Sequence, residues 1–477
     1  MTHAAAMRRL ADIPLIASAP DSYAVAPEEM RRAATPLPGD HEVDWGLVVV
    51  LRRQVSDQVT RETEAYAERV GTPMPDADRR LLARSIISRT VQAHAADQVD
   101  RGEFWSVERE HAYADALEDA IFGYGRLQPL FEMPDVENIE IHGCDSVVVQ
   151  YGDGHRVELP PVADSDEELI EAIRFLGESV SPPRPFDDAH PTMTLALGNR
   201  HRLHAIGFGL SFRPSIVIRQ HILTTIDLPE LVDRGMMPDD VGRLLHAAVL
   251  NRTSIVIAGD QGAGKTTLLR ALIASIPHNE RFGTLETDYE LLTHLQPGRR
   301  NMLALQARVG LGEVTDGRSV GEFSVAQLIP EALRQNLARL VVGEVRGVEA
   351  GAMFEAMQSG AGTLSTTHSH SAVSTMDRLA ARVAQGGVLS VDEAYRQISM
   401  HIGFIVHVHL VDDTWRGGVR TRKVSQVLAL TGAMEGNRPV THLVYQAASE
   451  TEPERFQPEP RTMDELGPFH ASWRAEP

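Results

Sequence analysis

The sequence predicts an α/β protein whose main domain is built on a parallel sheet, preceded by a smaller α/β domain and an N-terminal helical bundle. Three observations predict the main domain. Strands and helices alternate from about Ile226 to Tyr445, a glycine-rich loop at 259–266 separates a strand from a helix, and the strands at Ser254–Ala258 and Leu340–Val342 are unbroken apolar runs. Such runs are typical of parallel sheets that are covered on both faces.

The composition limits the class of protein. A chain of 477 residues has room for roughly two to four domains. A formal net charge of −20 argues against a wholly basic nucleic-acid-binding surface, although it leaves room for a local basic groove. The single cysteine, Cys144, excludes an intrachain disulfide and fits a reducing compartment. No apolar run approaches the length of a membrane span and residues 1–26 do not read as a signal peptide, so we expect a soluble cytoplasmic protein.

The N-terminal part is predicted to be an arm followed by helices. Residues 1–42 are rich in Ala, Pro and charged side chains without a sustained period, and we expect a flexible arm. Apolar residues recur at helical spacing over 43–124, which predicts a small helical bundle. The Pro-rich segment Gly71–Pro75 separates its first two helices, and a third helix is expected at Val107–Phe122.

Residues 125–222 predict the smaller α/β domain. Short apolar and β-branched runs between turn residues indicate strands, and one amphipathic stretch indicates a helix. The strands are expected at 139–142, 147–151, 192–197, 201–206 and 215–219, and the helix at about 167–176. The main domain follows at 223–445. Because residues 446–477 are rich in Glu, Pro and Gln, we expect a disordered tail there.

The glycine-rich loop has the pattern G-x-x-x-x-G-K-[ST], which is typical of phosphate-binding loops. Glycines allow backbone N–H groups to turn inward, and the following helix N-terminus favours an anion. Lys265 is then expected to reach the β- and γ-phosphates of a nucleotide, and Thr266 to bind Mg²⁺. A turn that binds nothing is disfavoured by the strand–loop–helix context. The predicted nucleotide-binding residues are Gly259, Gln261, Gly262, Ala263, Gly264, Lys265, Thr266 and Thr267.

A second element supplies the carboxylate that an NTPase needs near its metal and its attacking water. The apolar strand Leu340–Val342 is followed by Gly343 and Glu344, as in a Walker B element. Glu344 is therefore predicted to polarise a water molecule or to hold Mg²⁺ through one. A glutamate at a strand end is by itself often only a solvated residue, but downstream of a phosphate loop the functional interpretation is favoured.

The surrounding residues resemble a known family. Val342–Ala350 resembles the V-G-E-V-R-x-x-E-A signature of the type II/type IV secretion ATPases, and most closely that of the CpaF-type branch, which drives Tad pili. Leu285–Leu291 resembles the acidic "Asp box" of these proteins, and Ser365–Ser369 resembles their "His box". Phe122–Leu130 resembles the segment at which the family's N-terminal domain begins, and Ile216–Arg219 resembles the segment at which that domain ends. The resemblance extends from about residue 120 to 430.

This resemblance implies a RecA-like phosphate-loop motor domain preceded by a PAS-like α/β domain, and it implies roles for single residues. Glu286 would position the attacking water with Glu344, and His368 would contact the γ-phosphate or relay its loss. Arg219 and Arg202, on the N-terminal domain, would supply transition-state charge, and Arg346 would organise the site. The alternatives are a surface acid for Glu286, a structural histidine, and arginines in surface ion pairs.

The resemblance also implies an ATPase that uses ATP and Mg²⁺ and works as a homo-hexamer. Such a ring would lie at the cytoplasmic face of the inner membrane and drive platform proteins of a pilus or secretion system. The acidic net charge argues against nucleic acid as a partner, and none is expected. Binding between the two α/β domains would close them, and hydrolysis would reopen them.

Two other classes remain open on the sequence. One is a RecA-like motor that remodels nucleic acid or serves conjugation, which a basic channel and salt-dependent affinity would support. The other is an assembly subunit that binds nucleotide with little turnover. Three departures from the family pattern motivate the second class: Ala338 in place of an aspartate before the Walker B strand, Thr287 in place of an aspartate in the Asp box, and the absence of a histidine in Ser359–Gly362.

Overall fold

The computed structural model covers the helical bundle, the smaller α/β domain and the main domain. The expected flexible arm at 1–42 lies outside the described residues, and so does Arg346. The described residues are 43–180, 183–198, 200–296, 298–308, 310, 314–315, 318–345, 347, 349–358, 362–387, 389–449 and 453–474.

Three helices form the N-terminal bundle. They are α2 (Trp45–Val70), α3 (Asp76–Asp100) and α4 (Val107–Phe122). Apolar residues at helical spacing bury one stripe of each helix around Tyr113, whose side chain is fully buried and whose hydroxyl accepts a hydrogen bond from the backbone of Asp44. None of the described helices is both long and apolar enough to cross a bilayer.

The smaller α/β domain contains a six-stranded antiparallel sheet packed against one helix. The strand order is β3-β2-β1-β6-β5-β4. Inward-facing apolar residues of these strands and of α6 form a separate core, and the strands alternate between buried and more exposed positions. The elements are α5 (Gln128–Glu132), β1 (Val136–His142), β2 (Val147–Tyr151), β3 (Arg156–Leu159), α6 (Asp166–Ser179), β4 (Thr192–Leu197), β5 (His201–Ile206) and β6 (Ser215–Gln220).

The main domain is built on a nine-stranded sheet with the order β17-β16-β15-β14-β7-β13-β12-β8-β9. The strands from β14 to β9 run parallel, and β15, β16 and β17 continue the sheet with antiparallel pairing. The strands are β7 (Ile255–Gly259), β8 (Phe282–Glu286), β9 (Met302–Gln306), β12 (Arg339–Val342), β13 (Gly362–His368), β14 (Phe404–Asp412), β15 (Arg420–Glu435), β16 (Arg438–Gln446) and β17 (Arg455–Phe456).

Helices cover both faces of this sheet, which explains the unbroken apolar strands. Ile255 and Ile257 of β7 face one core, and Val256 between them faces the other. The first core contains residues of α7 (Leu228–Asp233), α8 (Asp239–Leu250) and α9 (Lys265–Ala274). The second contains residues of α10 (Val325–Leu333), α11 (Glu349–Gln358), α12 (Ala372–Gln385) and α13 (Val391–His401). The predicted α/β fold class is therefore confirmed.

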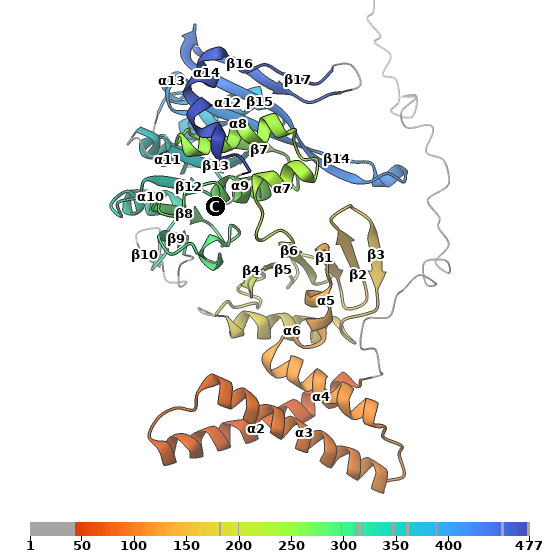
Figure 1. Cartoon of the computed structure of the whole chain (residues 1–477). Helices are drawn as coiled ribbons and strands as arrows, with labels where there is room; N and C mark the ends of the chain where they lie inside the picture. Colours follow the sequence, from red (N-terminus) through yellow and green to blue (C-terminus); the bar gives the residue numbers. More distant parts are fainter. Residues whose placement is uncertain are drawn as a thin grey trace, which may run out of the picture.

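The three parts are stacked along the molecule (Figure 1). The bundle lies at one end, the six-stranded domain in the middle and the nine-stranded domain at the other end. A segment after β6 leads from the middle domain directly into α7 of the main domain. This order places the six-stranded domain next to the main domain, in which the nucleotide loop was predicted.

The expectation of a disordered tail is wrong for the described part of 446–477. A helix, α14 (Pro460–Leu466), is followed by a short helical turn, and both pack on α8. Leu466 is buried in the main core, and the Trp473 ring lies so close to Gly242 that a Cβ there would be 2.8 Å from it. The Glu- and Pro-rich composition concealed the large apolar side chains of Phe456, Met463, Leu466, Phe469 and Trp473, whose packing on the core offsets the cost of ordering the segment.

Candidate nucleotide site

The predicted site residues come together at one edge of the parallel sheet. The order β7-β13-β12-β8 makes these four strands neighbours, and all four end at the same edge. In register, His368 at the end of β13 pairs with Gly259 at the end of β7. Glu286 ends β8, and Glu344 lies in the loop that follows β12. The carboxyl edge of a parallel sheet is where functional loops gather, because each strand delivers its loop there.

The phosphate loop is closely packed and has the backbone conformation that glycine permits. A Cβ on Gly259 would lie 2.3 Å from the carbonyl oxygen of Val408 on the neighbouring strand, so a side chain does not fit there. Gly262 and Gly264 have φ angles of +74° and +94°, in the left-handed region that glycine adopts at little cost. Helix α9 begins directly at Lys265. The loop therefore ends on a helix N-terminus, an arrangement suited to phosphate.

Lys265 holds the loop and touches the histidine of β13. Its Nζ donates to the carbonyl oxygens of Gly259 (3.0 Å) and Asp260 (2.8 Å), and it lies 3.3 Å from Nδ1 of His368. A lysine ammonium can only donate, so Nδ1 of His368 is the acceptor in this contact. The proton of the neutral imidazole is then on Nε2.

The other ring nitrogen of His368 lies beside the carboxylate of Glu344. Nε2 of His368 lies 3.0 Å from Oε1 of Glu344. His368 thus lies between the ammonium of Lys265 and the carboxylate of Glu344, with one ring nitrogen beside each. These contacts connect two sequence motifs that are separated along the chain but adjacent in the sheet.

The loop that carries Glu344 is fixed to β13. The hydroxyl of Thr366 donates to the carbonyl oxygen of Gly343 at 2.6 Å, and the hydroxyl of Thr367 donates to that of Val345 at 3.0 Å. The backbone N–H of Val345 donates to the carbonyl of Thr366 at 2.7 Å. These bonds on both sides of Glu344 hold its backbone in place and leave its side chain directed toward the loop.

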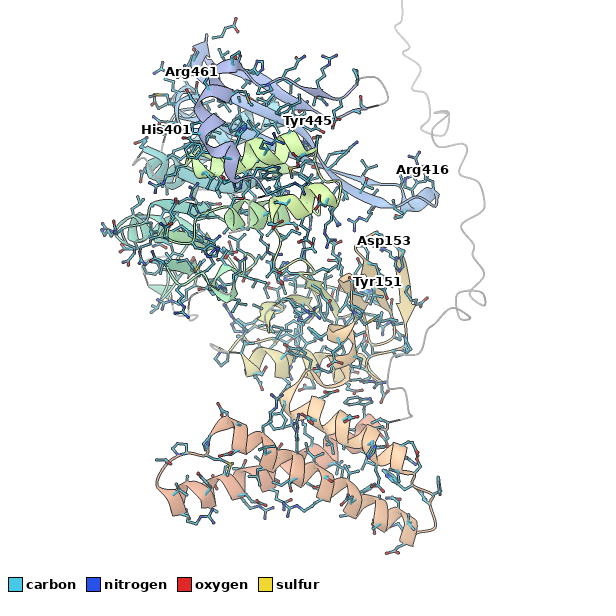
Figure 2. The ribbon with its side chains drawn as sticks, in the orientation of Figure 1. Tyr151, Asp153, His401, Arg416, Tyr445 and Arg461 are labelled. Carbon is cyan, nitrogen blue, oxygen red and sulfur yellow. The ribbon has the colours of Figure 1, made fainter. Side chains whose placement is uncertain are left out.

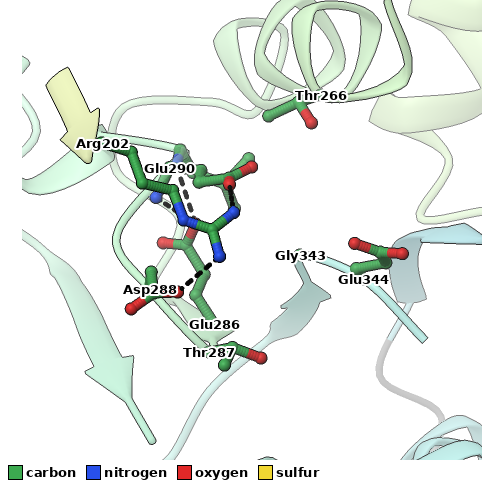
Figure 3. Close-up of a pocket in the computed structure, with 9 residues that line it drawn as sticks. Arg202, Thr266, Glu286, Thr287, Asp288, Glu290, Gly343 and Glu344 are labelled. Carbon is green, nitrogen blue, oxygen red and sulfur yellow. Dashed lines mark hydrogen bonds and ion pairs between the residues drawn. The ribbon is translucent and has the colours of Figure 1, made fainter. Parts of the chain in front are cut away.

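Thr266 and Glu344 face the same cavity, together with Glu286 and Arg202 (Figure 3). Mg²⁺ in nucleotide sites is typically held by one or two protein oxygens plus phosphate oxygens and waters. A hydroxyl from the loop and a carboxylate across the cavity fit that donor set. Among the described residues, no group of three or more His, Cys, Asp or Glu side chains is arranged to hold a metal ion.

Glu286 is almost fully buried beneath the loop between β8 and β9. Its Oε1 accepts the backbone N–H groups of Glu290 (2.9 Å) and Leu291 (2.7 Å), whereas its Oε2 has no hydrogen-bond partner. A Cβ on Gly343 would lie 3.1 Å from Cγ of Glu286, so the glycine gives this side chain room. Burial is the main cause that raises the pKa of the Glu286 carboxyl to about 7.

The raised pKa predicts a pH-dependent stability. The unfolded chain loses this proton near 4.5 and the folded protein only near 7, so the stabilising contribution present at low pH is lost as the pH rises through 7. The ionised carboxylate then costs about 3 kcal/mol. The variant Glu286→Gln can keep the two N–H acceptor bonds without this cost. In thermal melts without nucleotide, the melting temperature of Glu286→Gln should exceed that of the wild type, and the difference should be larger at pH 8 than at pH 5. A difference that does not change with pH would contradict the raised pKa of Glu286.

Two arginines of the smaller domain face the cavity from the other side. Arg202 on β5 and Arg219 on β6 are directly paired across the sheet. Arg202 forms ion pairs with Asp288 (3.1 Å) and Glu290 (2.8 Å), which join the two α/β domains (Figure 3). Arg219 lines the same cavity as Lys265, and its guanidinium makes no hydrogen bond or ion pair with the described residues. Arg202 is thus engaged in this conformation, whereas the Arg219 guanidinium stays available to an anion.

The cavity between the two domains has a volume of about 210 Å³. Its lining includes most of the predicted residues. They are Arg202, Arg219, Gln261, Gly262, Gly264, Lys265, Thr266, Thr267, Glu344 and His368, and the lining also includes Glu290 and Thr366, which were not predicted. Ala263, also predicted, is fully buried at the base of the loop, and Arg346 lies outside the described residues.

A comparison with protein families agrees with this geometry. The family model described as "Type II/IV secretion system protein" matches residues 169–430, which include both sides of the cavity and more than half of the chain. The chain belongs to this family. It is an ATPase of the type II/IV secretion superfamily. The narrower assignment to one branch of the superfamily stays a prediction.

Two curated relatives and one solved structure illustrate the family. A Mycobacterium tuberculosis protein whose name assigns it to conjugal transfer is 31% identical over 309 residues, covering 61% of this chain and 82% of the relative. The VirB11 protein of Rhizobium radiobacter is 29% identical over 183 residues, covering 38% and 50%. The crystal structure of the ATPase DotB from Yersinia pseudotuberculosis is 19% identical with a TM-score of 0.45, covering 67% and 81%.

The structure changes the meaning of Ala338, a departure from the family pattern. Ala338 precedes β12, whose carboxyl end leads to Gly343. Five residues of extended chain span about 16 Å, so position 338 lies at the sheet edge opposite the site. The fully buried Arg339 beside it is paired with Glu280 at 2.8 Å. A side chain at 338 therefore supplies no carboxylate to the cavity, and its being alanine is no evidence for weak turnover.

The sequence interpretation missed several residues of this family site. Asp288, which pairs with Arg202, lies between Glu286 and Glu290 of the Asp box, and the alternation of acids at 286, 288 and 290 could have indicated it. Arg270 of α9 donates to the carbonyl oxygens of Glu290 and Leu223, at 3.1 and 2.8 Å. His407 of β14 contacts the backbone of Ser369 at 3.2 Å. No sequence signal marks the last two.

Proposed function

We propose that this family ATPase binds Mg-ATP between its two α/β domains and hydrolyses it to drive a secretion or pilus machine. The observation that carries the proposal is the contact of His368 with both Lys265 and Glu344, at 3.3 and 3.0 Å. It links the group that would hold the terminal phosphates to the carboxylate that would act on water. Release of the γ-phosphate would change the partners of both.

The residues divide the work of phosphoryl transfer. The loop N–H groups and Lys265 would bind the phosphate oxygens, and Thr266 with Glu344 would hold Mg²⁺, which when bound offsets the charge on the β- and γ-phosphates. Glu344 would orient the attacking water and accept its proton. Glu286, half of whose carboxylate is committed to backbone N–H groups, is better suited to fixing the loop of Asp288 and Glu290 than to acting on water directly.

Arginines of the N-terminal domain would complete the site when the domains close. Arg219 lines the cavity opposite Lys265, and Arg202 is held by two acids of the main domain. A shift of either domain would move both arginines relative to the phosphates. Such a motion can do work only if the open and closed arrangements differ in their affinity for ATP.

The assembly and its partners extend the proposal beyond one chain. We infer a homo-hexameric ring at the cytoplasmic face of the inner membrane, acting on platform proteins of a pilus or secretion system. Membership of the type II/IV secretion family supports a membrane-embedded partner, and the sequence signature at Val342–Ala350 favours a Tad-pilus branch. The name of the Mycobacterium relative favours conjugation as the second candidate machine.

The test combines assembly with turnover. Multi-angle light scattering of the purified chain, with and without a non-hydrolysable ATP analogue and Mg²⁺, should show a ring-sized species that the analogue stabilises. Steady-state phosphate release should be measurable under the same conditions with ATP and Mg²⁺, and should disappear when the metal is chelated. A protein that stays monomeric with the analogue and releases no phosphate at any concentration would contradict the motor proposal.

A further inference from the structure

One side chain of the main domain connects the phosphate loop to the smaller α/β domain. Arg422 lies on β15 and uses every part of its guanidinium. Its Nε donates to the carbonyl oxygen of Gly262 at 2.7 Å, and its Nη1 donates to that of Gly152 at 3.2 Å. Its Nη2 lies 2.8 and 2.6 Å from the two carboxylate oxygens of Glu137.

The first of these bonds fixes a peptide of the phosphate loop. In a trans peptide the C=O of Gly262 and the N–H of Ala263 point in opposite directions, so holding the carbonyl also sets the direction of the N–H. The backbone N–H groups of this loop are the donors that cradle phosphate. Gly264 is also in reach: a Cβ there would lie 3.4 Å from Cδ of Arg422. The Arg422 side chain therefore stabilises the backbone of the phosphate loop at Gly262 and packs against Gly264.

The other bonds are made to the N-terminal domain. Glu137 is in β1, and Gly152 is the first residue of the turn between β2 and β3. The contact is reinforced by the neighbouring Arg420, whose backbone N–H donates to the carbonyl of Asp153 at 2.7 Å. In Figure 2, Asp153 in this turn and Arg416 in the turn between β14 and β15 lie on hairpins that approach each other. The side chain of Glu137 is 13% exposed, so its charge is largely removed from water.

We propose that Arg422 is a positioning residue that couples the placement of the N-terminal α/β domain to the geometry of the phosphate loop. While Glu137 holds the guanidinium, the Gly262 carbonyl is held as well. A displacement of the smaller domain that separates Glu137 from Arg422 releases this peptide and loosens the cradle. The inference rests on the proposed binding of Mg-ATP at this loop, and it adds a residue pair outside the cavity.

The coupling is reciprocal, because a site that binds better in one domain arrangement also favours that arrangement when occupied. Arg422 acts beside the loop, and Arg202 joins the same two domains at the far side of the cavity through Asp288 and Glu290. Among the described residues, ion pairs between the domains therefore flank the cavity on two sides, and on the Arg422 side Arg420 also lies 3.8 Å from Glu137. Of these, only the Arg422 contact reaches the backbone of the phosphate loop directly.

The test removes the charge of Glu137, the member of the Glu137–Arg422 pair that lies in the smaller domain. Glu137→Gln keeps the shape of the side chain but loses its charge, and no described hydrogen bond or ion pair joins Glu137 to the phosphate loop itself. We expect the Kd of a fluorescent ATP analogue with Mg²⁺, and the KM for ATP, to rise about tenfold, within the usual range for coupled sites. The kcat should stay within about twofold, because Lys265, Glu344 and His368 are untouched. Glu140→Gln is the matched control: it lies on the same strand and pairs with Arg156, away from the loop.

A double-mutant cycle separates coupling from simple destabilisation. Arg422→Gln should weaken binding at least as much as Glu137→Gln, and the double variant should bind no more weakly than Arg422→Gln alone. Arg422→Lys, whose compact ammonium cannot reproduce the planar fork that reaches Gly262, Gly152 and Glu137, should not rescue binding. If the wild type binds the analogue and Glu137→Gln binds it as tightly as Glu140→Gln, the inference is overturned. If the wild type itself does not bind, the proposed function fails instead.

Discussion

Replacing Lys265 by alanine is expected to abolish ATP turnover and to weaken nucleotide binding by two orders of magnitude or more. The ammonium group is placed at the helix N-terminus, and on nucleotide binding it would exchange its contacts with the Gly259 and Asp260 carbonyls for phosphate oxygens. Charge-assisted hydrogen bonds of this kind are each worth about 1.5–3 kcal/mol, so losing two of them accounts for the effect. Equilibrium titration with the fluorescent analogue and steady-state phosphate release measure the two quantities.

The chain offers an unusually clean control for this variant. It contains only one other lysine, Lys423, which lies on β15. Lys423→Ala removes the same charge from the main domain and should leave binding and turnover near those of the wild type. Circular dichroism of both variants should match the wild type. A Lys265→Ala protein that binds and hydrolyses ATP like the Lys423→Ala protein would disprove the assignment of the loop.

Replacing Glu344 by glutamine is expected to separate binding from hydrolysis. The amide keeps the size of the side chain but cannot accept the proton of an attacking water, and a general base typically contributes 10²–10⁴-fold to the rate. The kcat should therefore fall by about 10²–10⁴-fold, whereas the Kd for the analogue should change by less than about tenfold. Single-turnover phosphate release is the measurement, because it isolates the chemical step from product release.

Glu349→Gln is the matched control for Glu344→Gln, because Glu349 begins the helix α11 that follows the loop of Glu344. Glu349 accepts the backbone N–H of Gly347 at 2.7 Å, and an amide oxygen can replace that acceptor. Its turnover should stay within a few-fold of the wild type. Hydrolysis at the wild-type rate by the Glu344→Gln protein would contradict the proposed mechanism. Glu286, whose second carboxylate oxygen has no hydrogen-bond partner, would then be the next candidate for the group that activates water.

The α/β fold class could be predicted because its signals are local. An unbroken apolar strand such as Ser254–Ala258 requires cover on both faces, and the two cores on either side of β7 provide it. The tail could not be predicted in the same way. Its composition favours disorder, but Leu466 and Trp473 find a complementary surface on α8 that no local pattern of the tail contains.

For the candidate site, too, the residues within one contiguous motif could be predicted, whereas contacts between distant parts of the chain could not. The phosphate loop could be predicted residue by residue, and family resemblance indicated Glu286, Glu344 and His368. Resemblance also suggested that Ala338 weakens the site, because a sequence motif does not say which end of a strand faces the cavity. The direction of β12 placed position 338 at the opposite edge. Asp288 was missed because its partner, Arg202, comes from a different domain.

By itself, then, the sequence determined the loop from Gly259 to Thr266, because glycine conformations, a strand end and a helix start are properties of a contiguous segment. The tertiary structure alone decided what surrounds that loop. His368 is 103 residues from Lys265 along the chain, and Glu137 is 285 residues from Arg422. Strand order brings the first pair together and domain packing the second, and both are set by the burial of whole elements rather than by any pattern near the residues that meet.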